Sequence, residues 1–138
     1  MSWIPVTMRA AVRERAAGRC EYCLVSDEDV LIPHEPDHVV AEQHGGQTNL
    51  ENLALACFHC NRSKGPNLAS MDPDTRQLAA LFQPRIQKWA AHFALSQAQL
   101  VGLTPTGRAT VFLLRLNSLD RLRLREALLA VGRYPAPK

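Results

Sequence analysis

Apolar residues in the first half of the chain predict a few short elements. Residues 7–17 are rich in alanine and arginine and have the composition of a helix that ends at Gly18, a common helix stop. Apolar runs at 38–41 and 53–56 have the length of strands, and residues 60–64 open a short helix before a Gly-Pro stop. This half is therefore predicted as a small α+β unit.

The second half is predicted to contain a strand hairpin and three helices. The predicted helices cover residues 84–91, 106–116 and 118–131, and the predicted strands cover 93–95 and 99–103. Between the two halves, residues 73–83 fit either a loop or a weak helix. Several apolar residues of the last two helices are most simply core residues. They are Leu113, Leu116, Leu124, Leu128 and Val131.

The overall composition is that of a folded protein without a membrane segment. Of the 138 residues, 46% are hydrophobic and 21% are charged, a balance that argues against disorder. No apolar run reaches the roughly 18 residues that a membrane span needs. Residues 1–10 lack the basic and then apolar pattern of a secretory signal. We therefore expect a cytoplasmic protein with no membrane partner.

Charge divides the chain between Pro66 and Pro73. Residues 1–71 carry a net charge of −3 and residues 72–138 carry +6, which together give the +3 of the whole chain. We predict a core at 1–71 and a basic C-terminal extension at 72–138 that packs on it. Such an extension suits the binding of a polyanion, although arginine-rich helices also occur simply as solvated surfaces.

All four cysteines fall into two Cys-x-x-Cys pairs, Cys20 with Cys23 and Cys57 with Cys60. This spacing lets both thiolates of a pair reach one tetrahedral zinc ion, and two pairs complete a four-sulfur site. A disulfide and a redox-active pair are the alternatives, and both suit a cytoplasmic chain less well. We expect a structural Zn(Cys)4 site, because four sulfurs leave no open position for catalysis.

Polar residues with a different chemistry lie inside and just after the loop between the pairs. Asp37 and His38 are neighbours on a predicted strand, so their side chains point to opposite faces, and Asn61 directly follows a cysteine. A carboxylate and an amide oxygen suit Mg²⁺ or Mn²⁺. A histidine that titrates near neutrality can deprotonate a water. Together these groups predict metal-assisted hydrolysis of a phosphodiester.

Residues 18–67 resemble the HNH endonuclease family, the zinc-bound branch of the ββα-metal, or His-Me finger, nucleases. The resemblance rests on CEYC and on PDHVVAEQHGGQTNLENLALACFHCNRSKG, where paired cysteines, DH, GG, NL, CN and a following lysine keep the family order. Asn61 stands in place of a histidine, which makes this an H-N-N variant similar to the phage junction-resolving endonucleases. The implied fold is a ββα-metal core stapled by the Zn(Cys)4 site, with an N-terminal helix and a helical and hairpin C-terminal extension.

The resemblance also implies a role for each motif residue. It implies His38 as the general base and Asp37 and Asn61 as ligands of one Mg²⁺ or Mn²⁺ ion separate from the zinc. It implies Asn52 as a brace for the loop that orients His38, and Lys64 as a phosphate contact. The implied products carry a 5′-phosphate and a 3′-hydroxyl.

Further contacts to nucleic acid are expected around the second cysteine pair and in the extension. Arg62 is a candidate for a phosphate contact, with a solvated arginine as the alternative. His59 is a candidate for a surface or groove contact, with a third metal ligand as the alternative. Five arginines of the extension are candidates for contacts along DNA phosphates. Three of them alternate along a helix and so spread around its surface without forming one stripe, and the neighbouring leucines suit a dimer face equally. The five arginines are Arg115, Arg121, Arg123, Arg125 and Arg133.

The sequence thus predicts a metal-dependent HNH endonuclease whose partner is DNA. One ββα site cleaves one strand, so a monomer is expected to nick DNA and a homodimer to cut both strands. The first alternative is a zinc-knuckle module that binds nucleic acid without catalysis. It is disfavoured because binding alone needs none of Asp37, His38 and Asn61. The second is an interaction protein in which zinc has only a structural role.

Overall fold

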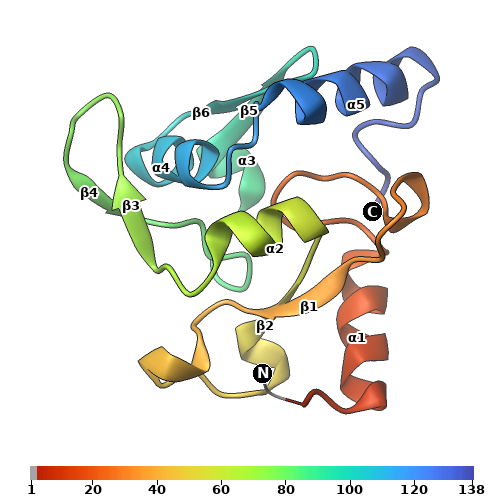
Figure 1. Ribbon diagram of the computed structural model, residues 1–138, viewed down its shortest axis with the longest axis vertical. Coiled ribbons are helices and arrows are strands. Elements are labelled where there is room, and N and C mark those ends of the chain that lie inside the picture. The colour runs from red at the N-terminus through yellow and green to blue at the C-terminus, as the bar shows by residue number, and fades with distance from the viewer. Residues whose placement is uncertain (1–2) are drawn as a thin grey trace.

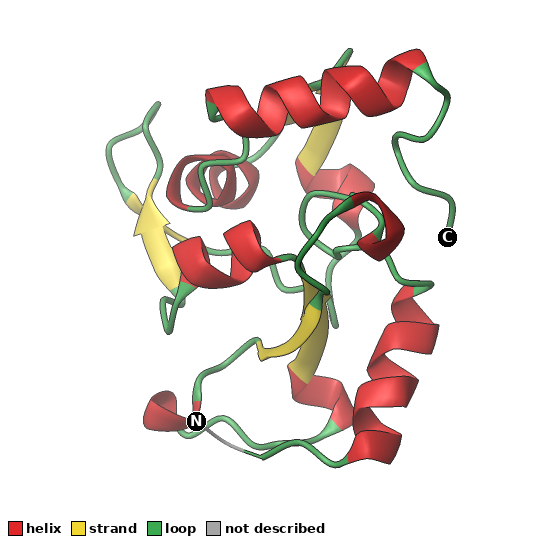
Figure 2. Cartoon of the chain, turned by 45° about the vertical axis from the view of Figure 1, so that its right-hand side comes forward, coloured by secondary structure: helices red, strands yellow, loops and turns green. Residues whose placement is uncertain are grey.

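The structure is a computed structural model that describes residues 3–138, and in this range it has five α-helices and three two-stranded sheets. The α+β class predicted from the sequence is confirmed. Figure 1 shows the elements in order, and Figure 2 shows the helices arranged around the short strands. The helices are α1 (Val6–Ala16), α2 (Phe58–Lys64), α3 (Trp89–His92), α4 (Pro105–Leu113) and α5 (Leu119–Ala130). The strands are β1 (Glu35–His38), β2 (Leu53–Ala56), β3 (Ala69–Met71), β4 (Leu78–Ala80), β5 (Phe93–Ser96) and β6 (Gln99–Gly102).

Strands β1 and β2 and helix α2 form a compact ββα unit. The two strands pair antiparallel, with Asp37 opposite Ala54 and His38 opposite Leu53. Every residue of β2 is buried, and α1 packs against it through Val12. The chain enters α2 directly after β2, so the strand that pairs with the Asp37 segment also fixes where the helix begins (Figure 1).

Strand β1 lies three residues earlier than the predicted strand at 38–41, and Asn52 explains the difference. The backbone amide of Val39 still donates to the Asn52 carbonyl at 2.9 Å. At Val40, the side chain of Asn52 replaces the backbone partner: its Oδ1 accepts from the Val40 amide and its Nδ2 donates to the Val40 carbonyl, both at 2.9 Å. A side chain that satisfies both backbone groups ends the ladder, and the chain then leaves the sheet.

The elements of the second half match the sequence in part. The hairpin of β5 and β6 and the positions of α4 and α5 are as predicted, although α4 is capped by Thr104 and begins at Pro105. The predicted helix at 84–91 is wrong, since only the short α3 forms there. The sequence analysis missed the hairpin of β3 and β4, whose turn is stabilised by a buried Asp72 that is paired with Arg108 at 2.9 Å.

One hydrophobic core joins residues from both halves of the chain. It combines Tyr22 and Cys23 with aromatic and leucine side chains of the second half, such as Phe82 and Phe93. Backbone carbonyls of the first cysteine pair also accept hydrogen bonds from the extension: Trp89 Nε1 donates to Tyr22 at 2.8 Å and Tyr134 Oη donates to Cys23 at 2.7 Å. The predicted division at residue 71 stays a prediction, and the packing across it is close.

Two expectations about the last helix are wrong. Val131 is 68% exposed and not a core residue, because it lies just beyond the end of α5, whereas Leu116 and Leu128 are buried as predicted. The expected phosphate contact is also wrong for Arg121 and Arg125, since both are buried.

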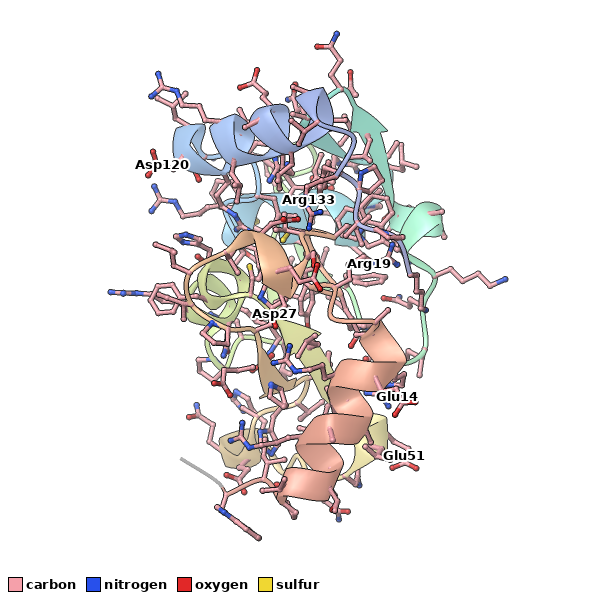
Figure 3. The ribbon with its side chains drawn as sticks, turned by 90° about the vertical axis from the view of Figure 1, so that its right-hand side faces the viewer. Glu14, Arg19, Asp27, Glu51, Asp120 and Arg133 are labelled. Carbon is pink, nitrogen blue, oxygen red and sulfur yellow. The ribbon has the colours of Figure 1, made fainter. Side chains whose placement is uncertain are left out.

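Arg133 is also removed from the predicted phosphate contacts, because it is ion-paired with the loop of the first half. Its Nε lies 2.7 Å from Asp29, and Figure 3 shows it beside that loop. Arg115 and Arg123 remain as exposed members of the predicted set. Among residues 3–138, no helix combines the length and the apolar character needed to span a bilayer.

Candidate functional site

The four cysteine sulfurs form one buried cluster. All four lie within 4.8 Å of one another, and the Cys23 and Cys57 sulfurs are 3.8 Å apart. Four sulfurs placed tetrahedrally about 2.3 Å from a zinc ion are themselves about 3.8 Å apart. No disulfide joins these cysteines. The cluster is therefore positioned to hold a metal ion, with the donor set of a structural zinc site.

Arg121 reaches this cluster from α5. Its Nη2 donates to Cys60 Sγ at 2.9 Å and lies 3.6 Å from Cys57 Sγ, while its Nη1 donates to the Leu114 carbonyl at 2.8 Å. Burial lowers the pKa of Arg121, but the neighbouring thiolates outweigh burial and raise that pKa above its ordinary value. The guanidinium is therefore charged at any pH at which the protein is folded.

Helix α2 connects the cluster to a pocket beside β1. Cys60 points into the sulfur cluster, and the next residue, Asn61, lines a pocket of about 570 Å³ together with Asp37 and His38. The structure thus brings together the three residues for which the sequence predicted catalytic chemistry. Glu42 and Arg9 line the same pocket, and the sequence analysis singled out neither of them.

Asp37 and Lys64 form a buried ion pair at the base of this pocket. The Lys64 ammonium lies 3.1 Å from Asp37 Oδ2 and donates to the carbonyl of His38 at 3.1 Å. Lys64 is only 2% exposed, so its charge faces Asp37 and not solvent. Burial raises the pKa of the Asp37 carboxyl, against the lowering effect of Lys64. The predicted phosphate contact of Lys64 stays a prediction, and it would require this ammonium to leave Asp37.

Asp37 Oδ2 allows a test of whether the pocket fits a divalent ion. This oxygen is buried and lies 3.1 Å from the Lys64 ammonium, with which it forms an ion pair. A carboxylate has about four acceptor positions, so one ammonium leaves acceptor capacity on the Asp37 carboxylate for a cation. Asn61, which carries an amide oxygen, lines the same pocket. The donor set of Asp37 and Asn61 therefore fits an oxygen-bound ion such as Mg²⁺ or Mn²⁺.

His38 is oriented by a residue that the sequence analysis did not identify. One of its ring nitrogens, Nε2, is hydrogen-bonded to Thr48 Oγ1 at 2.8 Å. A hydrogen-bond partner on one ring nitrogen restrains how the ring is turned. Thr48 lies in the loop between β1 and β2, and its position in the sequence gives no signal of this contact.

The loop that carries Thr48 is itself held by Asn52. In addition to its two bonds to Val40, Asn52 Nδ2 donates to the Gln47 carbonyl at 2.8 Å. Gly46 passes so close to β1 that an added Cβ would lie 1.7 Å from the Val40 carbonyl oxygen. The loop therefore has both a polar anchor and a position where only glycine fits, which keeps it close to the strand that carries His38.

Two further residues predicted to contact nucleic acid, His59 and Arg62, do not line the first pocket. His59 is exposed and lines a second, mainly apolar pocket of about 380 Å³ beside α5, whereas Asp37 and His38 line the first pocket. Arg62 is exposed, and its guanidinium lies 5.8 Å from the ring centre of Phe58. The structure does not bring His59 together with the groups that line the first pocket.

These features agree with the comparison to known proteins. Residues 20–67 match the family described as HNH endonuclease. This segment is an HNH domain. The match begins at Cys20 and ends just beyond α2, so the HNH domain contains the sulfur cluster and Asp37, His38 and Asn61, while Ile4 and Arg9 complete the pocket from outside it.

The similarity extends beyond the HNH domain in one relative. Over 122 residues the chain is 25% identical to Septu protein PtuB from Bacillus thuringiensis, a match that covers 87% of this chain and 45% of the relative. The chain thus spans less than half the length of that relative. No solved structure gives a significant match.

Proposed function

We propose that this chain is a metal-dependent HNH endonuclease that hydrolyses phosphodiester bonds in DNA. The pocket shared by Asp37, His38 and Asn61, within a segment that matches the HNH family, is the observation that carries the proposal. Oxygen donors for a cation lie there beside a histidine with a fixed ring, as hydrolysis of a phosphodiester requires.

In this proposal each residue acts on a defined atom. His38, held by Thr48, takes a proton from a water molecule, and the resulting hydroxide attacks the phosphorus. The bond from phosphorus to the 3′ oxygen breaks, which leaves a 5′-phosphate on one fragment and a 3′-hydroxyl on the other. Asp37 and Asn61 would hold a divalent ion, which would supply positive charge to stabilise the phosphate and the leaving oxygen.

The remaining residues hold this arrangement and bind the polymer. Asn52 keeps the Thr48 loop against β1, and the cysteine cluster, with zinc as its metal, fixes the start of α2 and so the position of Asn61. Arg62, exposed on α2, contacts a backbone phosphate. A single pocket per chain cuts one strand, so a monomer nicks DNA and a homodimer cuts both strands.

Nicking of supercoiled plasmid tests the proposal. Zinc-loaded protein is incubated with plasmid in Mg²⁺, in Mn²⁺ or in EDTA, beside His38→Ala and the control His44→Ala. His44 is an exposed histidine that does not line the pocket, so its removal leaves the chemistry intact. We expect metal-dependent relaxed or linear product from the wild type and the control, and a rate lower by about 10²–10⁴-fold from His38→Ala.

Two results would contradict the proposal. If wild type and His38→Ala nick equally, His38 is not the base. If neither nicks in any metal while a gel shift shows DNA binding, the chain is a binding module that lacks catalysis.

A further inference from the structure

The contact between Arg121 and the cysteine sulfurs comes from outside the HNH domain. Arg121 lies on α5, and the segment that matches the family ends at residue 67. Its guanidinium is 6% exposed and donates to Cys60 Sγ at 2.9 Å. Among the described residues, no other side-chain nitrogen is hydrogen-bonded to these sulfurs. The C-terminal extension therefore places one positive charge directly on the cluster.

The charge of a four-sulfur site explains why a guanidinium suits this position. Four thiolates around a divalent ion leave two excess negative charges. All four sulfurs are buried here, and an uncompensated charge in a protein interior is costly. A fixed guanidinium at hydrogen-bonding distance from Cys60 Sγ offsets one of those two negative charges and covers that sulfur.

The guanidinium is also held in place from its other side. Arg121 Nη1 donates to the carbonyl of Leu114, which closes α4, so the plane of the guanidinium is fixed before it meets the sulfurs. Arg121 therefore connects Leu114, at the end of α4, to Cys60 in α2, the residue before Asn61. Groups that hydrogen-bond to metal ligands commonly tune how tightly the metal is held.

We propose that Arg121 is part of the metal centre, where its guanidinium donates to the thiolate of Cys60 and raises the affinity of the cluster for zinc. The extension is then required for metal retention and does not act merely as a separate DNA-binding arm. This proposal does not depend on nuclease activity. Arg121 can prove irrelevant to zinc binding in an active nuclease, and it can prove necessary for zinc binding in a protein that does not cut DNA.

Competition for zinc with the chelator 4-(2-pyridylazo)resorcinol tests the proposal. The variants are Arg121→Met, which keeps an unbranched apolar stem and removes the charge and the donors, and Arg121→Lys, which keeps the charge without the planar fork. Arg123→Met is the control, because Arg123 is an exposed arginine on the same helix. We expect zinc affinity to fall by about 10–100-fold in Arg121→Met, to fall less in Arg121→Lys and to be unchanged in Arg123→Met.

A spectroscopic measurement separates this role from simple packing. In Co²⁺-substituted protein, the sulfur-to-metal charge-transfer band moves to lower energy when a thiolate loses a hydrogen bond. We expect that shift in Arg121→Met, and in Arg121→Leu if Arg121→Met does not fold, because neither side chain can donate a hydrogen bond to the sulfur. Wild-type zinc affinity and an unshifted band in the folded variant would overturn the proposal.

Discussion

The two faces of α2 carry sites of opposite character. On one face, Cys60 joins a cluster of four buried sulfurs covered by Arg121. On the other, Asn61 joins Asp37 and His38, which bring oxygen and nitrogen atoms to an open pocket. The two residues are consecutive, so one short helix places both sites. A metal bound by the closed cluster would hold α2 in place, and with it Asn61 in the open pocket.

Loss of the sulfur cluster is expected to have the largest effect on stability and nicking, because the cluster holds α2, which carries both sites. Cys23→Ser replaces a soft thiolate by a poor zinc ligand. Metal binding contributes on the order of 10–16 kcal/mol to the folded state of small zinc domains. We therefore expect the variant to lose its cooperative thermal transition, measured by circular dichroism beside metal content.

Chelation of the wild-type protein is the matching control, since it removes the metal and leaves the sequence unchanged. Both treatments should abolish nicking together with folding. A metal-free protein that melts at the wild-type temperature would show that the two faces of α2 are independent.

Changes to the Asp37–Lys64 pair are expected to separate stability from catalysis on the open face. Asp37→Asn leaves the buried Lys64 ammonium without its carboxylate, and breaking a buried pair in this way costs about 3–5 kcal/mol. The double variant Asp37→Asn, Lys64→Met removes both charges and should regain part of that stability. It should still fail to nick plasmid, because the metal ligand is gone.

Chemical denaturation and plasmid nicking of the two single variants and the double variant measure both effects. Recovery of nicking in the double variant would mean that Asp37 serves only to neutralise Lys64.

The smallest of these effects is expected at Thr48. Thr48→Val keeps the shape of the side chain and removes the hydroxyl that is hydrogen-bonded to His38 Nε2. We expect kcat for nicking to fall on the order of 10-fold, less than on removal of His38 itself. Zinc content and KM should stay at wild-type values, and Thr48→Ser should restore the rate. An equal loss of zinc and of kcat would place Thr48 in folding and not in orientation of the histidine.

The sequence predicted the parts of the site that depend on local spacing. The two Cys-x-x-Cys pairs indicated one metal cluster, and the sulfurs do lie together. The adjacency of Asp37 and His38, and of Cys60 and Asn61, was enough to predict a shared site, and all three pocket residues line one cavity. These are short-range relations that strand and helix geometry turns directly into positions.

Contacts that depend on tertiary packing could not be predicted from the sequence. Arg121 is one of several arginines in the extension, and only the fold shows that it is buried against sulfur and not exposed for DNA. Lys64 follows a motif and was assigned to a phosphate, yet its ammonium is directed to Asp37. The hairpin of β3 and β4 was missed because its turn depends on Asp72 and Arg108, which are 36 residues apart.

The order in which the chain is synthesised means that the Arg121 contact forms after the cysteines are available. Arg121 follows Cys60 by 61 residues, so all four sulfurs leave the ribosome well before α5 exists. A metal ion can be captured by the nascent chain while its guanidinium partner is still unmade. Helix α5 then packs onto a cluster that is already assembled, so its docking is a late step of folding. In a chain without metal, α5 would have no formed cluster to pack on and would stay undocked.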